Sequence, residues 1–311
     1  MNFTLEQFLE MPVEQVASLV RAAGPKVAVF PINGTRRWFA LEHAAAAQAS
    51  SDPMATYMDI AQRRHIELYR LFFEHGVDTL LTPVYGAELL SRGDEYVHRV
   101  QREGLARLAN HAEFLEFYDG YQVRVRFYGD YRKRFYGTPY EPLIALFDEV
   151  TRRTRTYERA RLFFGVFASD ATEAVAEASA AFYREQARVP TRRELIESYY
   201  GEYVEPVSFF LGFDKLSAFD YPLLATGEED LYFTVAPSPY LTERQLREIL
   251  YDHLYTRRAP EPDYAELGRE AWGWMKSFYG ANSERTLGVG TLKDGIWYPL
   301  FSVERPGERG Q

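Results

Sequence analysis

The sequence has 311 residues and contains no cysteine. The absence of cysteine excludes disulfide bonds, thiolate zinc sites and a cysteine nucleophile, and it is compatible with a reducing compartment. No apolar run approaches the ~20 residues that span a bilayer. Residues 1–13 lack the basic and apolar regions of a signal peptide. We therefore expect a cytoplasmic protein without a membrane span.

Positive charge is scarce as well. The chain has 36 lysine and arginine residues against 45 acidic residues, a formal net charge of −9. An acidic chain of this kind argues against general affinity for nucleic acid or anionic membranes. A basic binding site in this protein must therefore be local, and so selective for its ligand.

Several chemical motifs are also missing. The glycine spacings match neither a Walker loop nor a dinucleotide fingerprint. The Asp-Asp-x-x-Asp motif of class I terpene cyclases is absent, and the six histidines show no paired metal spacing. Among them, His43 and His65 are candidates for the neighbourhood of a site, whereas His75 and His253 have the pattern of helix-end or packing residues.

Aromatic side chains, by contrast, are abundant. They make up 16% of the chain, with 23 tyrosines and 22 phenylalanines. A large aromatic core is the simplest interpretation; the alternative is a pocket whose ring faces contact an apolar or cationic ligand. Composition does not choose between the two. Trp272 and Trp274 fall in the last predicted helix and are candidates for packing or for an interface.

Short apolar runs alternate with amphipathic stretches, which is typical of an α/β protein with a mostly parallel central sheet of about six strands flanked by helices. The predicted strands are residues 27–31, 79–83, 123–128, 162–168, 208–211 and 231–235. The predicted helices are residues 54–74, 94–118, 141–154, 171–186, 191–200, 242–255 and 264–279. We find no repeat and no long linker, so we expect one domain over residues 1–303 and a flexible tail at 304–311.

The loop after the first predicted strand carries the most informative residues. In an open α/β sheet, ligands bind at the carboxyl ends of strands, near the start of the next helix. Gly34 lets the backbone come close to a ligand, and the amides that follow it can point at an anion. Arg36 and Arg37 can each donate two hydrogen bonds to phosphate oxygens. The alternative is a surface turn with two solvated arginines.

The segment Asn33-Gly34-Thr35-Arg36-Arg37-Trp38 resembles the Asp-Gly-Asn-Gly-Arg-Trp loop of cis-prenyltransferases. Residues 216–219 and 230–234 resemble two further segments of that family. A closer resemblance is to a divergent branch with the same fold, the tuberculosinyl-adenosine transferase or isotuberculosinol synthase family of diterpene enzymes. It covers residues 8 to 298 and is carried by residues 24–26, 34–39, 73–76, 128–131, 199–204 and 231–238.

The resemblance implies a diphosphate site. Arg36 and Arg37 would hold the diphosphate with Gly34 and Thr35, and Tyr57 matches a tyrosine that shapes the site and assists cation formation or quenching. Asn33 stands where both families have aspartate. An asparagine offers only a neutral carbonyl oxygen and amide donors, so both Mg²⁺ binding and the usual ionisation chemistry stay open.

Two further acids are candidate metal ligands. Asp230 occupies the position of a Mg²⁺-binding glutamate in cis-prenyltransferases; an exposed turn acid is the alternative. Asp170 follows a predicted strand and is a weaker candidate, since Ser169 or Asp170 is also suited to cap the next helix.

We therefore predict a terpene synthase or prenyl transferase that ionises an allylic diphosphate of C15 to C25, most simply C20. It would release pyrophosphate, and the cation would cyclise, lose a proton or be captured by water or another nucleophile. Residues 210–215 are mostly apolar where elongating relatives bind isopentenyl diphosphate, which favours a single diphosphate substrate. The alternatives are a catalytically silent partner subunit and a cis-prenyl chain elongase. A homodimer is implied by the resemblance only.

Overall fold

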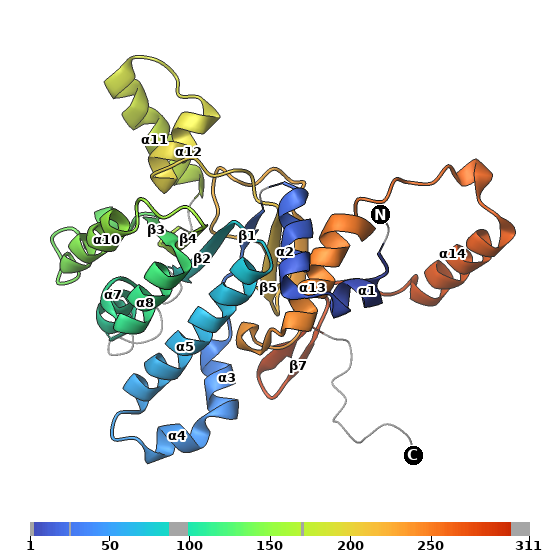
Figure 1. Cartoon of the computed structure of the whole chain (residues 1–311), viewed down its shortest axis with the longest axis horizontal. Helices are drawn as coiled ribbons and strands as arrows, with labels where there is room; N and C mark the ends of the chain where they lie inside the picture. The colour runs from blue at the N-terminus through green and yellow to red at the C-terminus, as the bar shows by residue number, and fades with distance from the viewer. Residues whose placement is uncertain (1–2, 25, 87–98, 169–170, 300–311) are drawn as a thin grey trace.

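A computed structural model describes residues 3–24, 26–86, 99–168 and 171–299. Six parallel strands form the central sheet in the order β3-β4-β2-β1-β5-β6 (Figure 1). This confirms the predicted α/β class with a parallel sheet. The strands are β1 (Val27–Val29), β2 (Thr79–Tyr85), β3 (Val123–Tyr128), β4 (Ala160–Val166), β5 (Phe209–Phe213) and β6 (Asp230–Thr234).

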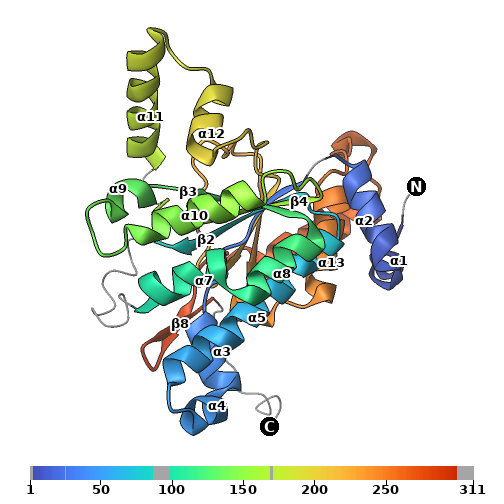
Figure 2. The ribbon, with the colours of Figure 1, turned by 60° about the vertical axis from the view of Figure 1, so that its left-hand side comes forward.

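Alternating residues of the strands feed two cores, because successive side chains point to opposite faces of a sheet. Ala28 and Phe164 belong to the larger core, whereas Val29 and Phe163 belong to the smaller one. Figure 2 shows helices covering the larger-core face. These helices are α1 (Leu5–Glu10), α2 (Val13–Ala22), α5 (Pro53–Glu74), α7 (Leu105–Asn110), α8 (Ala112–Tyr121), α10 (Pro142–Arg153) and α13 (Glu243–Tyr251).

The smaller core is covered by α12 (Arg192–Tyr200) and the segment that follows it, through Ile196, Tyr200 and Leu224. Next to α12 lies α11 (Ala171–Gln186), and the pair projects from the sheet (Figures 1 and 2). The shorter helices are α3 (Thr35–Glu42), α4 (Ala44–Ala49), α9 (Tyr131–Phe135) and the 3-10 turn η3 (Ser238–Tyr240).

Several helix starts follow from local side-chain chemistry. Thr191 with Glu194 and Thr242 with Gln245 form capping boxes at α12 and α13, as their sequence pattern predicts. At α5 the Asp52 carboxylate accepts hydrogen bonds from two backbone N–H groups, and Pro53 occupies the first helical position. This fixes the start of the long helix that faces the loop after β1.

The predicted helix 94–118 is wrong as a continuous helix. Its described part consists of a π-helical turn, η2 (Val100–Gly104), then α7 and α8, while residues 94–98 lie outside the described ranges. His111 has an extended backbone and separates α7 from α8. There its Nδ1 lies 2.7 Å from Gln62 Nε2 on α5. Packing against α5 therefore outweighs the continuous amphipathic pattern.

The C-terminal part also differs from the prediction. A π-helical turn, η4 (Asp252–Thr256), continues α13, and a 3-10 turn, η5 (Tyr264–Glu266), precedes α14 (Arg269–Asn282). The segment with α14 extends away from the sheet (Figure 1), and none of the α14 residues is buried. A small antiparallel hairpin follows, β7 (Thr291–Lys293) with β8 (Ile296–Tyr298). The tail predicted at 304–311 falls outside the described residues.

The strand order determines where a ligand can reach the sheet. From β1 the chain continues to β2 on one side, and it later crosses to β5 on the other side of β1. The carboxyl ends of β1 and β5 therefore flank the point where the direction of winding reverses, which is the usual ligand position in such sheets. In the described ranges we find no helix with the length and apolarity to cross a bilayer.

Candidate functional site

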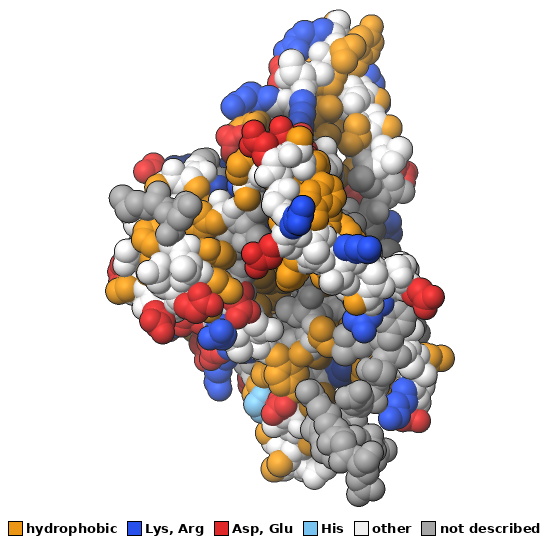
Figure 3. Space-filling view, turned by 90° about the vertical axis from the view of Figure 1, so that its right-hand side faces the viewer, with side chains coloured by type: hydrophobic (Ala, Val, Ile, Leu, Met, Phe, Trp, Pro, Cys, Tyr) orange, Lys and Arg blue, Asp and Glu red, His pale blue; other side chains and the backbone are white. Residues whose placement is uncertain are grey.

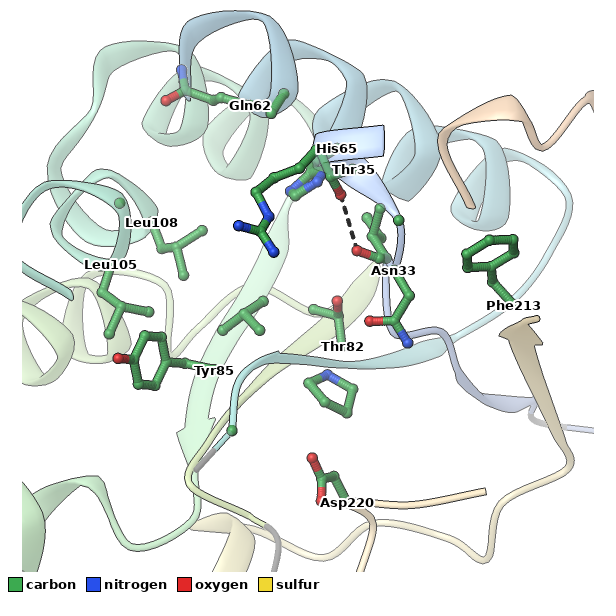
Figure 4. Close-up of a pocket in the computed structure, with 18 of the residues that line it drawn as sticks. Asn33, Thr35, Gln62, His65, Thr82, Tyr85, Leu105, Leu108, Phe213 and Asp220 are labelled. Atoms are coloured by element: carbon green, nitrogen blue, oxygen red, sulfur yellow. Dashed lines mark hydrogen bonds between the residues drawn. The ribbon is translucent and has the colours of Figure 1, made fainter. Parts of the chain in front are cut away.

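The loop after β1 ends directly in the first turn of α3. Gly34 has a left-handed backbone with φ of 76°, and Thr35, Arg36 and Arg37 are the first three helical residues. The Thr35 hydroxyl donates to the Ile32 carbonyl at 3.1 Å and fixes the turn (dashed line in Figure 4). Since the first N–H groups of a helix have no acceptor within the helix, this turn favours an anion.

Residues more than 200 positions further along the chain hold this loop in place. The N–H of Asn33 donates to Ser238 Oγ at 3.1 Å, and the N–H of Ser238 donates back to the Asn33 carbonyl at 3.0 Å. A Cβ added at Gly34 would lie 2.8 Å from Pro237 Cβ and 2.9 Å from the Phe213 ring. Glycine is therefore required here by backbone conformation and by space.

A cavity of about 580 Å³ opens beside the loop. Asn33, Gly34, Thr35, Arg36 and Arg37 line its polar end. Apolar and aromatic side chains form much of the other walls: Tyr57, Met58, Ala61, Val84, Leu105, Leu108, Phe114, Phe213 and Phe219. Polar and charged side chains also line these walls: Gln62, His65, Thr82, Arg107, Asp214, Lys215, Ser217 and Asp220. In Figure 4, Leu105, Leu108 and Tyr85 lie on one side of the cavity, and Asn33 and Phe213 on the other.

Tyr57 lies in the second turn of α5, where its ring meets that of Phe39 edge-on at 5.2 Å. Phe39 belongs to α3, so the aromatic pair joins the helix that carries the arginines to the helix that forms a cavity wall. Tyr57 is thereby held by packing next to the start of α3.

Arg37 has two neighbours at the end of β5. Its guanidinium lies 5.3 Å from the centre of the Phe213 ring, and its Nη1 is 3.7 Å from Asp214 Oδ2. Asp214 also lines the cavity. Burial raises the pKa of the Asp214 carboxyl, although the charges of Arg37 and Lys215 act in the opposite direction.

The sequence prediction missed Asp214. The available signal was an acid at the carboxyl end of a predicted strand, but its relevance depends on β5 lying next to β1. Asp220 is a second cavity-lining acid that was not predicted.

His65 lines the cavity, whereas His43 is not among the lining residues and packs its ring against Trp38 at 4.8 Å. His65 is half-buried, and its Nε2 is buried without a hydrogen-bond partner among the described residues. Burial, reinforced by the charge of Arg64, lowers the pKa of His65 to about 4. The imidazole is therefore neutral at physiological pH.

Asp230 lies away from the loop. It is the first residue of β6 and pairs with Phe209 at the start of β5, so it sits at the amino edge of the sheet. The Asp230 carboxylate is buried and interacts with His253 Nδ1 at 2.6 Å and with Arg258 at 3.0 Å. Asp230 is thus neither an exposed turn acid nor a neighbour of Asn33 in this chain. Asp170 lies outside the described residues.

The donor atoms of the cavity limit how Mg²⁺ could be held. No group of three or more His, Cys, Asp or Glu side chains that could bind a metal occurs in the described ranges. Mg²⁺ in phosphate sites is commonly held by one or two carboxylates together with substrate oxygens and water. The carboxylates that line the cavity are Asp220 and Asp214, and Asp214 faces the Arg37 guanidinium.

Solved structures define the class of fold. Lavandulyl diphosphate synthase from Lavandula x intermedia, in complex with dimethylallyl diphosphate, superposes with a TM-score of 0.52 at 12% identity, covering 79% of this chain and 100% of that one. A probable undecaprenyl diphosphate synthase from Campylobacter jejuni also gives 0.52, at 14% identity, covering 77% and 97%. The chain has the cis-prenyltransferase fold.

Sequence relatives define the family. Tuberculosinyl adenosine transferase from Mycobacterium tuberculosis is 44% identical over 301 residues, which are 96% of this chain and 99% of the relative. (+)-Kolavelool synthase from Herpetosiphon aurantiacus is 26% identical over 305 residues, 95% of each chain. No protein-family model matches the sequence. The protein belongs to the tuberculosinyl adenosine transferase family of diterpene enzymes, as the resemblance implied.

Proposed function

We propose that this enzyme ionises one allylic C20 diphosphate, releases pyrophosphate, and lets the cation cyclise, lose a proton or react with water or another nucleophile. The observation that carries the proposal is a cavity with a cationic helix start at one end and apolar, aromatic walls at the other. Its volume of about 580 Å³ is within the range of about 300–1,000 Å³ typical of small-molecule sites.

The leaving group would be stabilised at the start of α3. Negative charge grows on the diphosphate as the carbon–oxygen bond breaks. Arg36, Arg37 and the N–H groups of the first turn lie at this end of the cavity before the substrate binds, and their positive charge and dipoles would stabilise the charge on the leaving group. The side chain of Asn33 can add amide donors to the same end of the cavity, where an aspartate would repel the diphosphate.

The cation would be held by the aromatic walls. Tyr57, Phe114, Phe213 and Phe219 line the cavity beyond the arginines, and ring faces attract a positive charge. We propose that Tyr57, next to the diphosphate end, steers the last step of the reaction.

A single diphosphate is favoured over chain elongation. The segment that would clamp a second diphosphate forms β5 itself, whose five residues are all buried. Asp214 and Lys215 follow it as an acid and a single cation. One diphosphate site therefore accounts for the basic residues of this region.

Mg²⁺ would be held by Asp220 together with the diphosphate oxygens. A divalent cation at this position supplies additional neutralisation of the leaving group. The arginines and helix start carry the binding and orientation of the diphosphate in the same end of the cavity.

The protein is also proposed to form a homodimer through α14. Trp274 and Phe278 stack on each other at 5.5 Å, and their side chains are 71% and 48% exposed. Figure 3 shows the side of the molecule that lies on the right in Figure 1, and hydrophobic side chains are visible on this surface. Exposed aromatic clusters of this kind are typical of protein interfaces.

The function is tested by pyrophosphate release from a panel of prenyl diphosphates, including geranylgeranyl diphosphate and its bicyclic isomers, with and without Mg²⁺, and by mass spectrometry of the products. We expect turnover by the wild-type protein alone. Because each lost donor of this kind reduces the rate by about 10²–10³-fold, the double variant Arg36→Ala/Arg37→Ala should lose on the order of 10⁴-fold or more.

A matched control removes two adjacent arginines elsewhere. Arg152 and Arg153 end α10 and form surface ion pairs with Glu149 and Asp119. The variant Arg152→Ala/Arg153→Ala has the same change in net charge and should keep its activity. Unchanged turnover in the Arg36/Arg37 variant would refute the site. A folded wild-type protein that releases no pyrophosphate from any substrate would instead support a silent partner subunit.

A further inference from the structure

Asp214 is held rigidly between two strand ends. It directly follows β5, and its N–H donates to the carbonyl of Thr234, the last residue of β6, at 3.1 Å. Its backbone is left-handed, with φ of 71°. Aspartate tolerates this conformation better than most residues, but the conformation is still unfavourable. The sheet therefore imposes the position of this carboxylate.

The hydrogen-bonding capacity of the Asp214 carboxylate is not used within the described structure. Its Oδ1 is buried and has no hydrogen-bond partner among the described residues. Its Oδ2 is 3.7 Å from Arg37 Nη1, which is an ion pair but too long for a hydrogen bond. A buried carboxylate oxygen without a hydrogen-bond partner is unfavourable and is rare in native structures, so it calls for an explanation such as a functional role. The raised pKa of Asp214 has the same physical origin, the loss of water by burial.

Arg37 is shared between Asp214 and the proposed diphosphate. A diphosphate offers several charged oxygens and binds a guanidinium bidentately, whereas Asp214 contacts it only at 3.7 Å. When Arg37 turns to the diphosphate, Asp214 loses a nearby positive charge. The carboxylate then holds a proton more strongly, so substrate binding makes Asp214 a better proton acceptor.

We propose that Asp214 is the general base that accepts the proton of the nucleophile capturing the cation; the inference rests on the proposed function. The bond from carbon to the diphosphate oxygen breaks, and its electron pair leaves with the diphosphate. A lone pair of the nucleophile forms the new bond to the cationic carbon. The O–H or N–H proton of the nucleophile moves to the Asp214 carboxylate.

The other groups at the cavity are less suited to this role. Asn33 has no basic oxygen or nitrogen. Burial lowers the pKa of His65 to about 4, so it accepts a proton poorly. Besides Arg36 and Arg37 on α3, the charged residues that line the cavity with Asp214 are Lys215, Asp220 and Arg107, which pairs with Asp59. Asp220 lies in the loop between β5 and β6, where Mg²⁺ would engage it.

The test compares Asp214→Asn and Asp214→Ala with the wild-type enzyme, using the prenyl diphosphate that the wild type turns over fastest. General-base catalysis contributes about 10²–10⁴-fold, so we expect Asp214→Asn to lose that much capture product. Titration calorimetry with inorganic pyrophosphate should show binding as tight as that of the wild type or tighter. Formate should restore part of the rate of Asp214→Ala, because a small carboxylate can replace a missing base.

The pH profile supplies a second readout. The wild-type rate should rise with pH through a pKa above the ordinary aspartate value, and Asp214→Asn should lack this rise. Glu228→Gln, on an exposed part of the loop before β6, is the control for loss of one acidic charge and should behave as the wild type. Asp220→Asn should raise the Mg²⁺ concentration required for half-maximal activity.

Three results would overturn the inference while leaving the proposed function intact. The first is full activity of Asp214→Asn. The second is a loss that excess Mg²⁺ restores, which would make Asp214 a metal ligand. The third is a matching loss of pyrophosphate binding, which would make it a positioning residue for Arg37. A wild-type enzyme that releases no pyrophosphate refutes the function itself, and the base assignment with it.

Discussion

Replacing Gly34 with alanine tests the contact between the loop after β1 and the sheet. Alanine at a φ of 76° is unfavourable by about 1–2 kcal/mol. The new Cβ would also lie 2.8 Å from Pro237 Cβ and 2.9 Å from the Phe213 ring. Forcing a methyl group into a packed site costs about 1–3 kcal/mol. We expect Gly34→Ala to reduce the free energy of unfolding by about 2–5 kcal/mol.

A second glycine separates the two contributions. Gly137 has a φ of 70°, and a Cβ added there would meet nothing within 4 Å. Gly137→Ala should therefore show only the conformational part, about 1–2 kcal/mol. Urea unfolding of both variants measures the difference, which we expect to be about 1–3 kcal/mol. That difference reports the packing of the loop against β5 and the segment before η3.

Activity provides an independent check of the same contact. Relieving the clash moves the loop, and with it the first turn of α3. A displacement of about 1 Å can reduce turnover by about 100-fold, so pyrophosphate release should fall in Gly34→Ala and stay unchanged in Gly137→Ala. Equal destabilisation of the two variants, or wild-type turnover in Gly34→Ala, would refute the reasoning.

Two further predictions concern association and pH. Sedimentation should show a dimer for the wild-type protein and a monomer for Trp274→Glu/Phe278→Glu. The control is Tyr136→Glu, which changes an exposed aromatic residue outside α14 and should stay dimeric. A monomeric wild-type protein would contradict the proposal. Burial lowers the pKa of His65 from 6.5 to about 4. The neutral imidazole therefore leaves the free energy of unfolding undiminished above pH 6.5, and this free energy falls as the pH decreases from 6.5 toward 4. Urea unfolding across this pH range should show a smaller loss of the free energy of unfolding for His65→Gln than for the wild type, by on the order of 3 kcal/mol. Equal losses in the two proteins would contradict this prediction.

The strands were predictable because their signal is local. Each is a short apolar run that leads into a turn, and residues 123–128 match β3 without any shift. The first and last residues of a strand depend on its pairing with neighbouring strands, and this pairing cannot be read from the sequence. Strand β4 begins at Ala160 rather than at 162, because Ala160 and Arg161 pair with β3. The broken helix around His111 has the same cause, since contacts with α5 determine where α7 ends.

The structure of the loop after β1 was predictable for a similar reason. A strand, a glycine and two arginines at the start of a helix are contiguous in sequence. Asp214 comes from a strand about 180 residues away, and it reaches the loop only because β5 pairs with β1. The position of Asp230, by contrast, could have been predicted. It precedes the predicted strand 231–235, and all carboxyl ends of a parallel sheet lie at one edge, so its remote position followed from the strand prediction itself.

Asn33 and Asp214 together determine where negative charge lies at this site. An aspartate at position 33 would put a negative charge next to a bound diphosphate, and a bridging cation would then be needed to offset the repulsion. Asn33 removes that charge, so no carboxylate of the loop opposes the proposed binding of a diphosphate by Arg36, Arg37 and the helix start. Asp214, which follows β5, supplies a carboxylate next to the Arg37 guanidinium instead. Anion binding and proton transfer can then be served by different residues, with Arg37 shared between them.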